Sequence, residues 1–176
     1  MRCIVCGRLS LDIVCKTCAH EFLTPKYSQT TLHDLNIVYC YKYDDIAPLL
    51  LTKHTPVGHR VFNFMSKRTF SNFQIPYTLM PIDHRVKSGY SHSAVIAKQA
   101  GKYRLFNKLQ AANEVVYSGQ SKAYRQNNPR GFVYSGPAKK VVLVDDIFTT
   151  GNTLLEAKQA VEKGGAQVLF ALTLAH

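Results

Sequence analysis

The stretch from Val141 to Thr153, VVLVDDIFTTGNT, constrains the fold of this chain more than any other. Four aliphatic residues, 141–144, suit a short buried strand, and two adjacent carboxylates, Asp145 and Asp146, follow them. A small polar loop and a helical pattern over 154–161 come next. Strand, loop and helix form the repeating unit of parallel α/β sheets, whose ligands bind at the carboxyl ends of the strands. The sequence therefore predicts an α/β fold with a ligand site at this loop.

The loop that follows the two carboxylates suits a phosphate group. A glycine lets the backbone approach an anion closely, hydroxyl groups can donate hydrogen bonds, and free N–H groups at a helix start carry partial positive charge. The candidate phosphate ligands are Thr149, Thr150, Gly151, Asn152 and Thr153. Asp145 and Asp146 would repel a phosphate in contact, so they suit sugar hydroxyls or a Mg²⁺ ion instead. A phosphate, a sugar diol and a metal in a row describe a phosphorylated ribose.

A purely structural interpretation of the same residues stays open. Two aspartates after a strand can form a turn, and Thr-Thr-Gly-Asn-Thr can be only the capped start of a helix. A Walker-type nucleotide loop is disfavoured, because no Gly-Lys-Ser/Thr follows the glycine.

Four of the five cysteines form two Cys-x2-Cys pairs, which are separated by eight residues, 7–14. A single tetrahedral Zn²⁺ satisfies two such pairs, and a connector this short has no core of its own, so the metal is expected to hold the segment together. A thioredoxin-type redox pair would need a βαβ setting that is missing here. A closed four-thiolate site is structural, and His20 is read as a surface residue and Cys40 as a buried free thiol. The expected zinc ligands are Cys3, Cys6, Cys15 and Cys18.

Composition and charge limit the class of protein. The 176 residues suffice for one domain and a small appendage, and the division expected is a zinc ribbon at 1–22, a linker at 23–34 and an α/β domain at 35–176. With 22 Lys and Arg against 11 Asp and Glu, the net charge of +11 indicates an anionic partner, foremost nucleic acid, with a generic basic surface as the alternative. No apolar stretch approaches a membrane span, so a cytoplasmic protein is expected, and peripheral contact with the inner face of the membrane stays open.

Periodicity and turn signals predict several further elements. Strands are expected at 35–43, 77–82, 114–117 and 166–174. Helices are expected from a cap at Asp44 or Asp45 to Lys53, from a cap at Ser91 or Ser93 over 94–100, over 105–110, and after the phosphate loop to Gly164.

Three basic segments are candidate anion sites. The loop after the strand at 77–82 could form a second anion site, as a diphosphate would need, through Asp83, His84, Arg85 and Lys87, with Lys53 as a further contact or merely a solvated helix end. Residues 60–73 interleave aromatic with basic side chains, which suits either base stacking or an amphipathic helix facing its own core. Residues 120–132 form either a solvent-exposed connector or a nucleic-acid contact, with Lys122, Arg125 and Arg130 as candidates.

Residues 141–153 resemble the phosphoribosyl diphosphate (PRPP) signature of type I phosphoribosyltransferases. Over nearly its whole length the chain is similar to the ComF family of competence proteins, with four cysteines first, a basic loop in the middle and the signature near the end. In the basic loop it keeps Arg85, Lys87, Gly89 and an aromatic at Tyr90, and it has Ser88, Ser91 and His92 where the family has Arg, Asn and Gln. The residues Gln120, Arg125, Asn128 and Phe132 match a second family segment.

The resemblance implies a mostly parallel sheet of type I phosphoribosyltransferase, Rossmann-like, architecture with an N-terminal zinc ribbon. Asp145 and Asp146 would hold the ribose hydroxyls of PRPP with Mg²⁺, and residues 149–153 would cradle the 5′-phosphate. It also implies a role in natural transformation, handling incoming single-stranded DNA together with DNA-uptake channel or helicase proteins. An active phosphoribosyltransferase with an unknown acceptor and a PRPP sensor without turnover are the alternatives.

Overall fold

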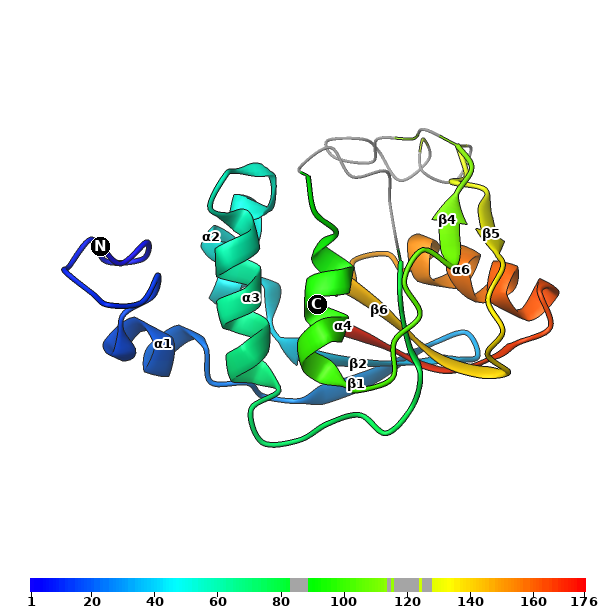
Figure 1. The fold of residues 1–176 in the computed structure, drawn as a ribbon, viewed down its shortest axis with the longest axis horizontal. Helices are drawn as coiled ribbons and strands as arrows, with labels where there is room; N and C mark the ends of the chain where they lie inside the picture. The colour runs from blue at the N-terminus through cyan, green and yellow to red at the C-terminus, as the bar shows by residue number, and fades with distance from the viewer. Residues whose placement is uncertain (83–88, 114, 116–123, 125–127) are drawn as a thin grey trace.

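A computed structural model of the chain shows a five-stranded sheet with helices on both faces (Figure 1). The structure describes residues 1–82, 89–113, 115, 124 and 128–176. The strand order is β1-β2-β7-β6-β3, in which β1 pairs antiparallel with β2 and all other neighbours are parallel. The strands of this sheet are β1 (Ser28–Leu32), β2 (Leu35–Tyr41), β3 (Leu79–Pro81), β6 (Lys140–Ile147) and β7 (Gln167–Ala175). The predicted α/β class with a mostly parallel sheet is confirmed.

Among the described residues, a two-stranded antiparallel ribbon and six helical segments accompany this sheet. The ribbon pairs β4 (Leu109–Ala111) with β5 (Phe132–Tyr134) and stands beside the last helix (Figure 1). The helical segments are α1 (Lys16–Phe22), α2 (Tyr43–Leu50), the 3₁₀ turn η1 (Leu51–His54), α3 (Gly58–Thr69), α4 (His92–Ala100) and α6 (Asn152–Lys163). Among the residues described, no helix is both long and apolar enough to cross a bilayer.

Strand β6 is buried on both faces. Val142 and Val144 pack into the core under α2, α3 and α4, whereas Val141 and Leu143 pack into a second core under α6 and the ribbon. Alternate side chains of a strand point to opposite faces, so an unbroken aliphatic run is what a doubly covered parallel strand requires. The run therefore fixes β6 in the middle of the molecule, and its carboxyl end carries the two aspartates.

The N-terminal segment packs on the same side as α3 and shares its core. Ile13, Val14 and Leu23 are buried in one cluster with residues of α2, α3 and α4. The Nε of Arg68 on α3 donates to the Leu23 carbonyl oxygen at 3.0 Å. In Figure 1 this segment lies at the opposite end of the molecule from the β4–β5 ribbon.

The edges of the sheet depart from the sequence expectations. The stretch predicted as a linker, 23–34, contains β1, whose polar sequence SQTTL has no apolar alternation because this edge strand is largely exposed. The predicted helix at 105–110 is wrong: Leu109 begins β4, a three-residue strand too short to show a period. The expected strand at 114–117 falls largely outside the described residues.

Helix α2 begins earlier than predicted. Its N-cap is Lys42, which makes no side-chain cap hydrogen bond, so neither aspartate is the cap. Asp44 and Asp45 lie in the first turn, where their negative charges still favour the helix start, and Pro48 lies inside the helix. Helix α4 begins as predicted, because the Ser91 Oγ accepts a hydrogen bond from the Ala94 N–H at 3.1 Å.

Shortening a side chain in the centre of β6 should destabilise the whole domain. Leu143→Ala leaves a cavity between β6 and α6, where neighbouring groups are tightly packed, so the free energy of unfolding should fall by about 2–5 kcal/mol. The matched control is Val133→Ala, because Val133 is 60% exposed on β5 and should cost less than about 1 kcal/mol. Denaturant unfolding measures both, and similar losses for the two variants would contradict the central place of β6.

Candidate functional site

The two aspartates lie inside β6, near its carboxyl end, and both are buried. Asp145 is 4% exposed and Asp146 is 8% exposed. The Asp145 Oδ1 accepts from the Ser93 Oγ at 3.2 Å and from the Asp146 N–H at 2.9 Å. The Asp146 Oδ1 accepts from the Ile147 N–H at 2.9 Å. These contacts fix the direction of both carboxylates within the sheet.

Burial raises the pKa of Asp145 well above its ordinary value, and the adjacent charge of Asp146 raises it further. The backbone N–H of Asp146, Lys53 and Ser93 oppose this shift only in part. A carboxylate that folding makes harder to ionise costs stability at neutral pH, so a role in folding alone does not account for it.

Among the described residues, Lys53 places a positive charge beside this pair. Its Nζ lies 3.2 Å from the Asp146 Oδ2, and its side chain is 30% exposed, while that of Asp146 is 11% exposed. Lys53 belongs to η1, which lies between α2 and α3, so the contact joins segments 93 residues apart in the sequence. The sequence suggested Lys53 as an anion contact, and the structure places it at the acid pair.

Sequence reasoning missed the role of α4 in this site. Ser93 was considered only as a helix cap, yet Ser91 is the cap and Ser93 points at Asp145. Ser93 is 3% exposed and lies on the same helical face as Ile96, Ala97 and Ala100, which are buried too. A polar residue in the apolar stripe of a helix was the signal that could have identified it.

The loop after β6 keeps a helix start open. Gly151, the N-cap of α6, has φ +75°, and a Cβ at this position would meet Leu32 and also Phe148 at 2.8 Å. In the part of the chain that is described, no side chain caps α6, and no acidic residue lies in its first turn. Residues 147–154 line a pocket of about 40 Å³. Uncapped N–H groups beside a pocket are suited to an anion.

Asn152 adds a donor to the same loop. Its Nδ2 atom is buried, and within the described ranges it has no hydrogen-bond partner. A buried amide without a partner costs free energy, which a bound oxygen acceptor would recover. The loop residues therefore fit a phosphate-sized anion better than they fit a closed structural turn.

The remaining predicted site residues divide into described and undescribed positions. Strand β3 ends beside β6, with the Ile82 N–H donating to the Val144 carbonyl at 2.9 Å. Arg130 lies next to β5 and is partly buried. Helix α3 turns Val61, Phe62 and Met65 into the core, as the amphipathic alternative for residues 60–73 predicts. The predicted residues that lie outside the described ranges are Asp83, His84, Arg85, Lys87, Lys122 and Arg125.

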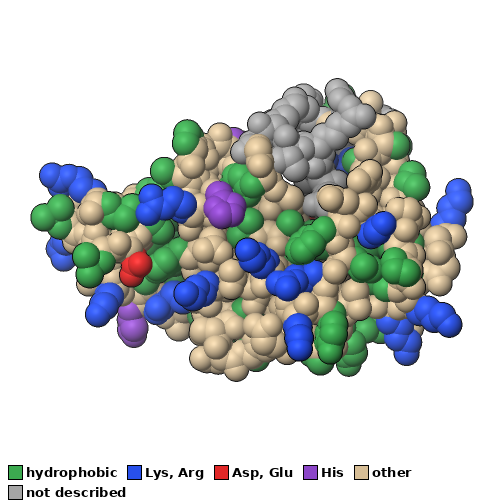
Figure 2. Space-filling view, in the orientation of Figure 1, with side chains coloured by type: hydrophobic (Ala, Val, Ile, Leu, Met, Phe, Trp, Pro, Cys, Tyr) green, Lys and Arg blue, Asp and Glu red, His purple; other side chains and the backbone are tan. Residues whose placement is uncertain are grey.

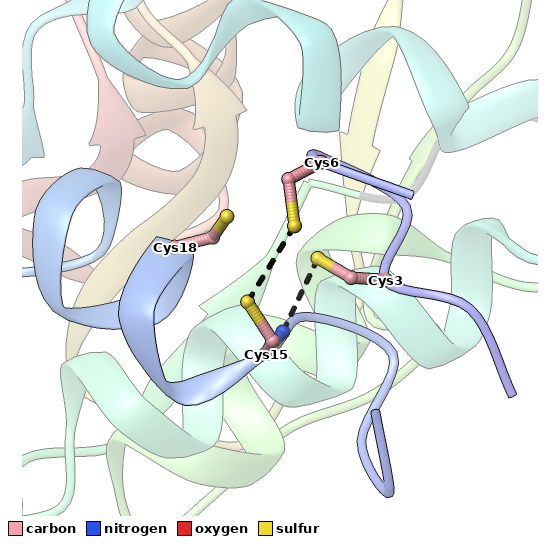
Figure 3. Close-up of side chains that lie close together, drawn as sticks. All are labelled: Cys3, Cys6, Cys15 and Cys18. Atoms are coloured by element: carbon pink, nitrogen blue, oxygen red, sulfur yellow. Dashed lines mark hydrogen bonds between the residues drawn. The ribbon is translucent and has the colours of Figure 1, made fainter. Parts of the chain in front are cut away.

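The four paired cysteines converge on one point (Figure 3). Their Sγ atoms all lie within 4.8 Å of one another, and the Cys6 and Cys15 sulfurs are 3.7 Å apart. A tetrahedral ion with metal–sulfur bonds of about 2.3 Å separates its sulfurs by about 3.8 Å, whereas a disulfide needs about 2.05 Å. All of these cysteines are free thiols, so the cluster can hold a metal ion.

The pKa values of the thiols in this cluster differ, because their surroundings differ. Burial and the neighbouring thiols raise the pKa of Cys18 to about 12. Burial opposes ionisation of Cys3 as well, but backbone hydrogen bonds, including that from the Cys15 N–H at 3.2 Å, lower its pKa to about 6. Bringing a thiol such as Cys18 into a metal site therefore requires release of its proton, so metal affinity should rise with pH.

Comparison with known proteins bears on the C-terminal part of the chain. The family model described as "Phosphoribosyl transferase domain" matches residues 107–176, which include the acid pair, the loop and α6. This match supports a phosphoribosyltransferase-type domain there. Among solved structures, adenine phosphoribosyltransferase from Leishmania tarentolae is similar with 12% identity and a TM-score of 0.39, over 88% of this chain and 84% of that chain. No curated protein matches this chain.

Neutralising Asp145 should stabilise the fold in a pH-dependent way. Because its pKa is raised in the folded state, the aspartate costs stability above its ordinary pKa of about 3.9 and costs nothing below it. Asp145→Asn should therefore raise the free energy of unfolding at pH 8, and its advantage over the parent should shrink as the pH falls to about 4. Urea unfolding at several pH values tests this, and an asparagine variant that is less stable at pH 8 would contradict it.

Proposed function

We propose that this protein binds PRPP with Mg²⁺ at the carboxyl end of β6. Asp145 and Asp146 would hold the ribose hydroxyls, and residues 149–153 would hold the 5′-phosphate. The observation that carries the proposal is a buried carboxylate pair next to an uncapped helix start, because each half alone would be unfavourable. A ligand with both a hydroxylated sugar and a phosphate satisfies both halves at once.

Magnesium would neutralise the oxygens of the diphosphate, as divalent cations do in phosphate sites. Of the chain's own residues, Ser93 keeps Asp145 turned in one direction and Lys53 balances the charge of Asp146. Gly151 packs against Leu32 and Phe148, where a Cβ would have no room, and this packing would fix the loop 149–153 that holds the 5′-phosphate. The basic residues Arg85 and Lys87 are proposed as ligands of the diphosphate on the resemblance alone.

The wider role we propose is handling of single-stranded DNA during natural transformation, in the manner that the resemblance to the ComF family implies. A net charge of +11 supports an anionic polymer as partner. The face in Figure 2 carries Lys and Arg over much of its extent and few acidic side chains. Lys122, Arg125 and Arg130 are proposed as DNA contacts, with DNA-uptake channel or helicase proteins as further partners in the cytoplasm.

Two alternatives use the same site differently. An active phosphoribosyltransferase would break the bond between ribose C1 and diphosphate and join C1 to an acceptor, and no residue described here identifies that acceptor. A PRPP sensor would bind the ligand without consuming it and change the behaviour of a partner. The phosphoribosyltransferase-type match over 107–176 is compatible with both.

We further propose that the four cysteines hold a structural Zn²⁺. Sulfur separations near those of a tetrahedral site and a backbone N–H donating to Cys3 support this choice. The segment 1–22 buries few residues of its own, so metal coordination would supply much of its stability.

Removing both charges of the acid pair should separate ligand binding from DNA binding. Asp145→Asn with Asp146→Asn should abolish calorimetric binding of PRPP with Mg²⁺, because neutral amides carry no charge to attract the cation and accept hydrogen bonds from hydroxyls more weakly than carboxylates do. Binding of a single-stranded oligonucleotide should stay equal or become tighter, since two negative charges are lost, and it should weaken steeply with salt in both proteins.

The matched control for this experiment is Asp44→Asn with Asp45→Asn, an adjacent but exposed acidic pair on α2. It removes the same charge and should leave PRPP binding intact. Equal PRPP affinity in the acid-pair variant and the control would reject the proposed site. Loss of DNA binding in the acid-pair variant alone, with the fold unchanged, would reject separate sites for the two ligands.

Chelation of the metal should affect only one end of the molecule. We expect a strong chelator to remove one Zn²⁺ per chain and to raise hydrogen exchange in residues 1–22, while the amides of β6 and β7 stay protected. Mass spectrometry of the intact protein and of its peptides measures both. Absence of stoichiometric zinc with residues 1–22 still protected would contradict a structural zinc site.

A further inference from the structure

Lys53 is held at two points, by its ammonium group and by its backbone. The ammonium meets the Asp146 Oδ2 at 3.2 Å. The backbone carbonyl accepts from the Tyr90 Oη at 3.0 Å and lies 2.9 Å from the His92 Nε2. A carbonyl oxygen can only accept, so the His92 Nε2 carries the proton and donates it. Two side chains thus converge on one peptide group of the short turn η1.

The surroundings of η1 leave little room for this turn to shift. The His92 ring packs edge-on against Tyr90 at a centroid distance of 4.7 Å and tilts against Phe62 at 5.2 Å. A Cβ on Gly58 would meet the Thr52 carbonyl oxygen and, at 2.5 Å, the Tyr90 Oη. Close packing therefore restricts the position of η1 together with the hydrogen bonds to the Lys53 carbonyl.

The surroundings of His92 favour its uncharged form. Burial lowers its pKa, and the nearby charges of Asp146 and Lys53 act in opposite directions on it. A glutamine side chain can also donate an N–H to a carbonyl, so His92→Gln would keep a donor while the shape of the side chain changes.

We propose that Tyr90 and His92 are positioning residues, which hold the turn at Lys53 so that its ammonium neutralises Asp146 until an oxyanion of the bound ligand takes the ammonium over. The first half of this statement concerns the protein alone, and the second half rests on the proposed PRPP site. The exchange suits lysine, because its ammonium is a compact charge with three donors on a flexible stem, and this side chain is 30% exposed. Tyr90 and His92 would thereby couple the start of α4 to the acid pair.

The positioning can be tested without any ligand. The rate at which an acylating reagent modifies Lys53, measured by peptide mass spectrometry, reports how long the amine spends away from Asp146, and the exposed Lys102 serves as an internal reference. Tyr90→Phe and His92→Leu each delete one donor, so each should speed modification of Lys53 roughly fivefold, the value of one hydrogen bond. His92→Gln restores an N–H donor and should stay near the parent rate.

The matched control is Tyr134→Phe, which deletes a tyrosine hydroxyl that donates to the Ala138 carbonyl at 2.9 Å on the α6 side of the sheet. It should leave the rate at Lys53 unchanged. An unchanged Lys53 rate in Tyr90→Phe and His92→Leu would overturn the positioning role. The same holds if His92→Gln behaves like His92→Leu, because the donated hydrogen bond would then be irrelevant.

Titration with PRPP and Mg²⁺ tests the exchange itself. In the parent, the acylation rate of Lys53 should change when the ligand binds. The affinity for PRPP should fall on the order of tenfold in Tyr90→Phe with His92→Leu, and it should recover in Tyr90→Phe with His92→Gln. A parent that does not bind PRPP would refute the proposed function while the ligand-free rates still decide the positioning. Binding that leaves the Lys53 rate unchanged would refute the exchange alone.

Discussion

Two carboxylates are buried side by side near the end of a strand that is covered on both faces, and the surrounding elements must compensate their negative charge. Asp145 and Asp146 are largely buried, and an uncompensated buried charge is among the most unfavourable features a core can contain. The compensation comes from the backbone of β6, from Ser93 on α4 and from Lys53 on η1. Helix α4 and the turn η1 must therefore pack close to the aspartates. Tyr90, His92 and Gly58 pack against η1.

The two faces of the sheet contribute different groups to this edge. The face covered by α3 and α4 supplies side chains, a hydroxyl and an ammonium, which act on the carboxylates. The face covered by α6 supplies backbone N–H groups and the Asn152 amide at an uncapped helix start. The first set stabilises negative charge that belongs to the protein, and the second set is suited to negative charge that arrives with a ligand.

The extent to which sequence predicts this arrangement follows from the range of each interaction. The run from 141 to 153 is local, and its strand, glycine turn and helix appear in the predicted order, although β6 continues through both aspartates to Ile147 instead of ending before them. The cysteine convergence is also local, because spacing alone brings two Cys-x2-Cys pairs around one point. Strand β1 and the β4–β5 ribbon were missed, since exposed or three-residue strands carry no apolar period. Lys53 and Ser93 contact the aspartates across 93 and 52 residues, and no local pattern encodes such a distance.

If the proposed function holds, the short separation between the acid pair and the open helix start would make the site selective for a phosphorylated ribose. Only Ile147 and Phe148 lie between Asp146 and the loop, and Phe148 is buried, so the two regions lie close together. A free phosphate would satisfy the loop but would meet two carboxylates within a few residues, and the repulsion would limit its affinity. A free sugar would satisfy the carboxylates but would leave the N–H groups and Asn152 without an acceptor. A phosphorylated ribose would place a hydroxyl pair and an anion on one frame, so it would interact favourably with both regions. On the exchange proposed for Lys53, a ligand with a further anionic group would also offer the Lys53 ammonium a partner in place of Asp146.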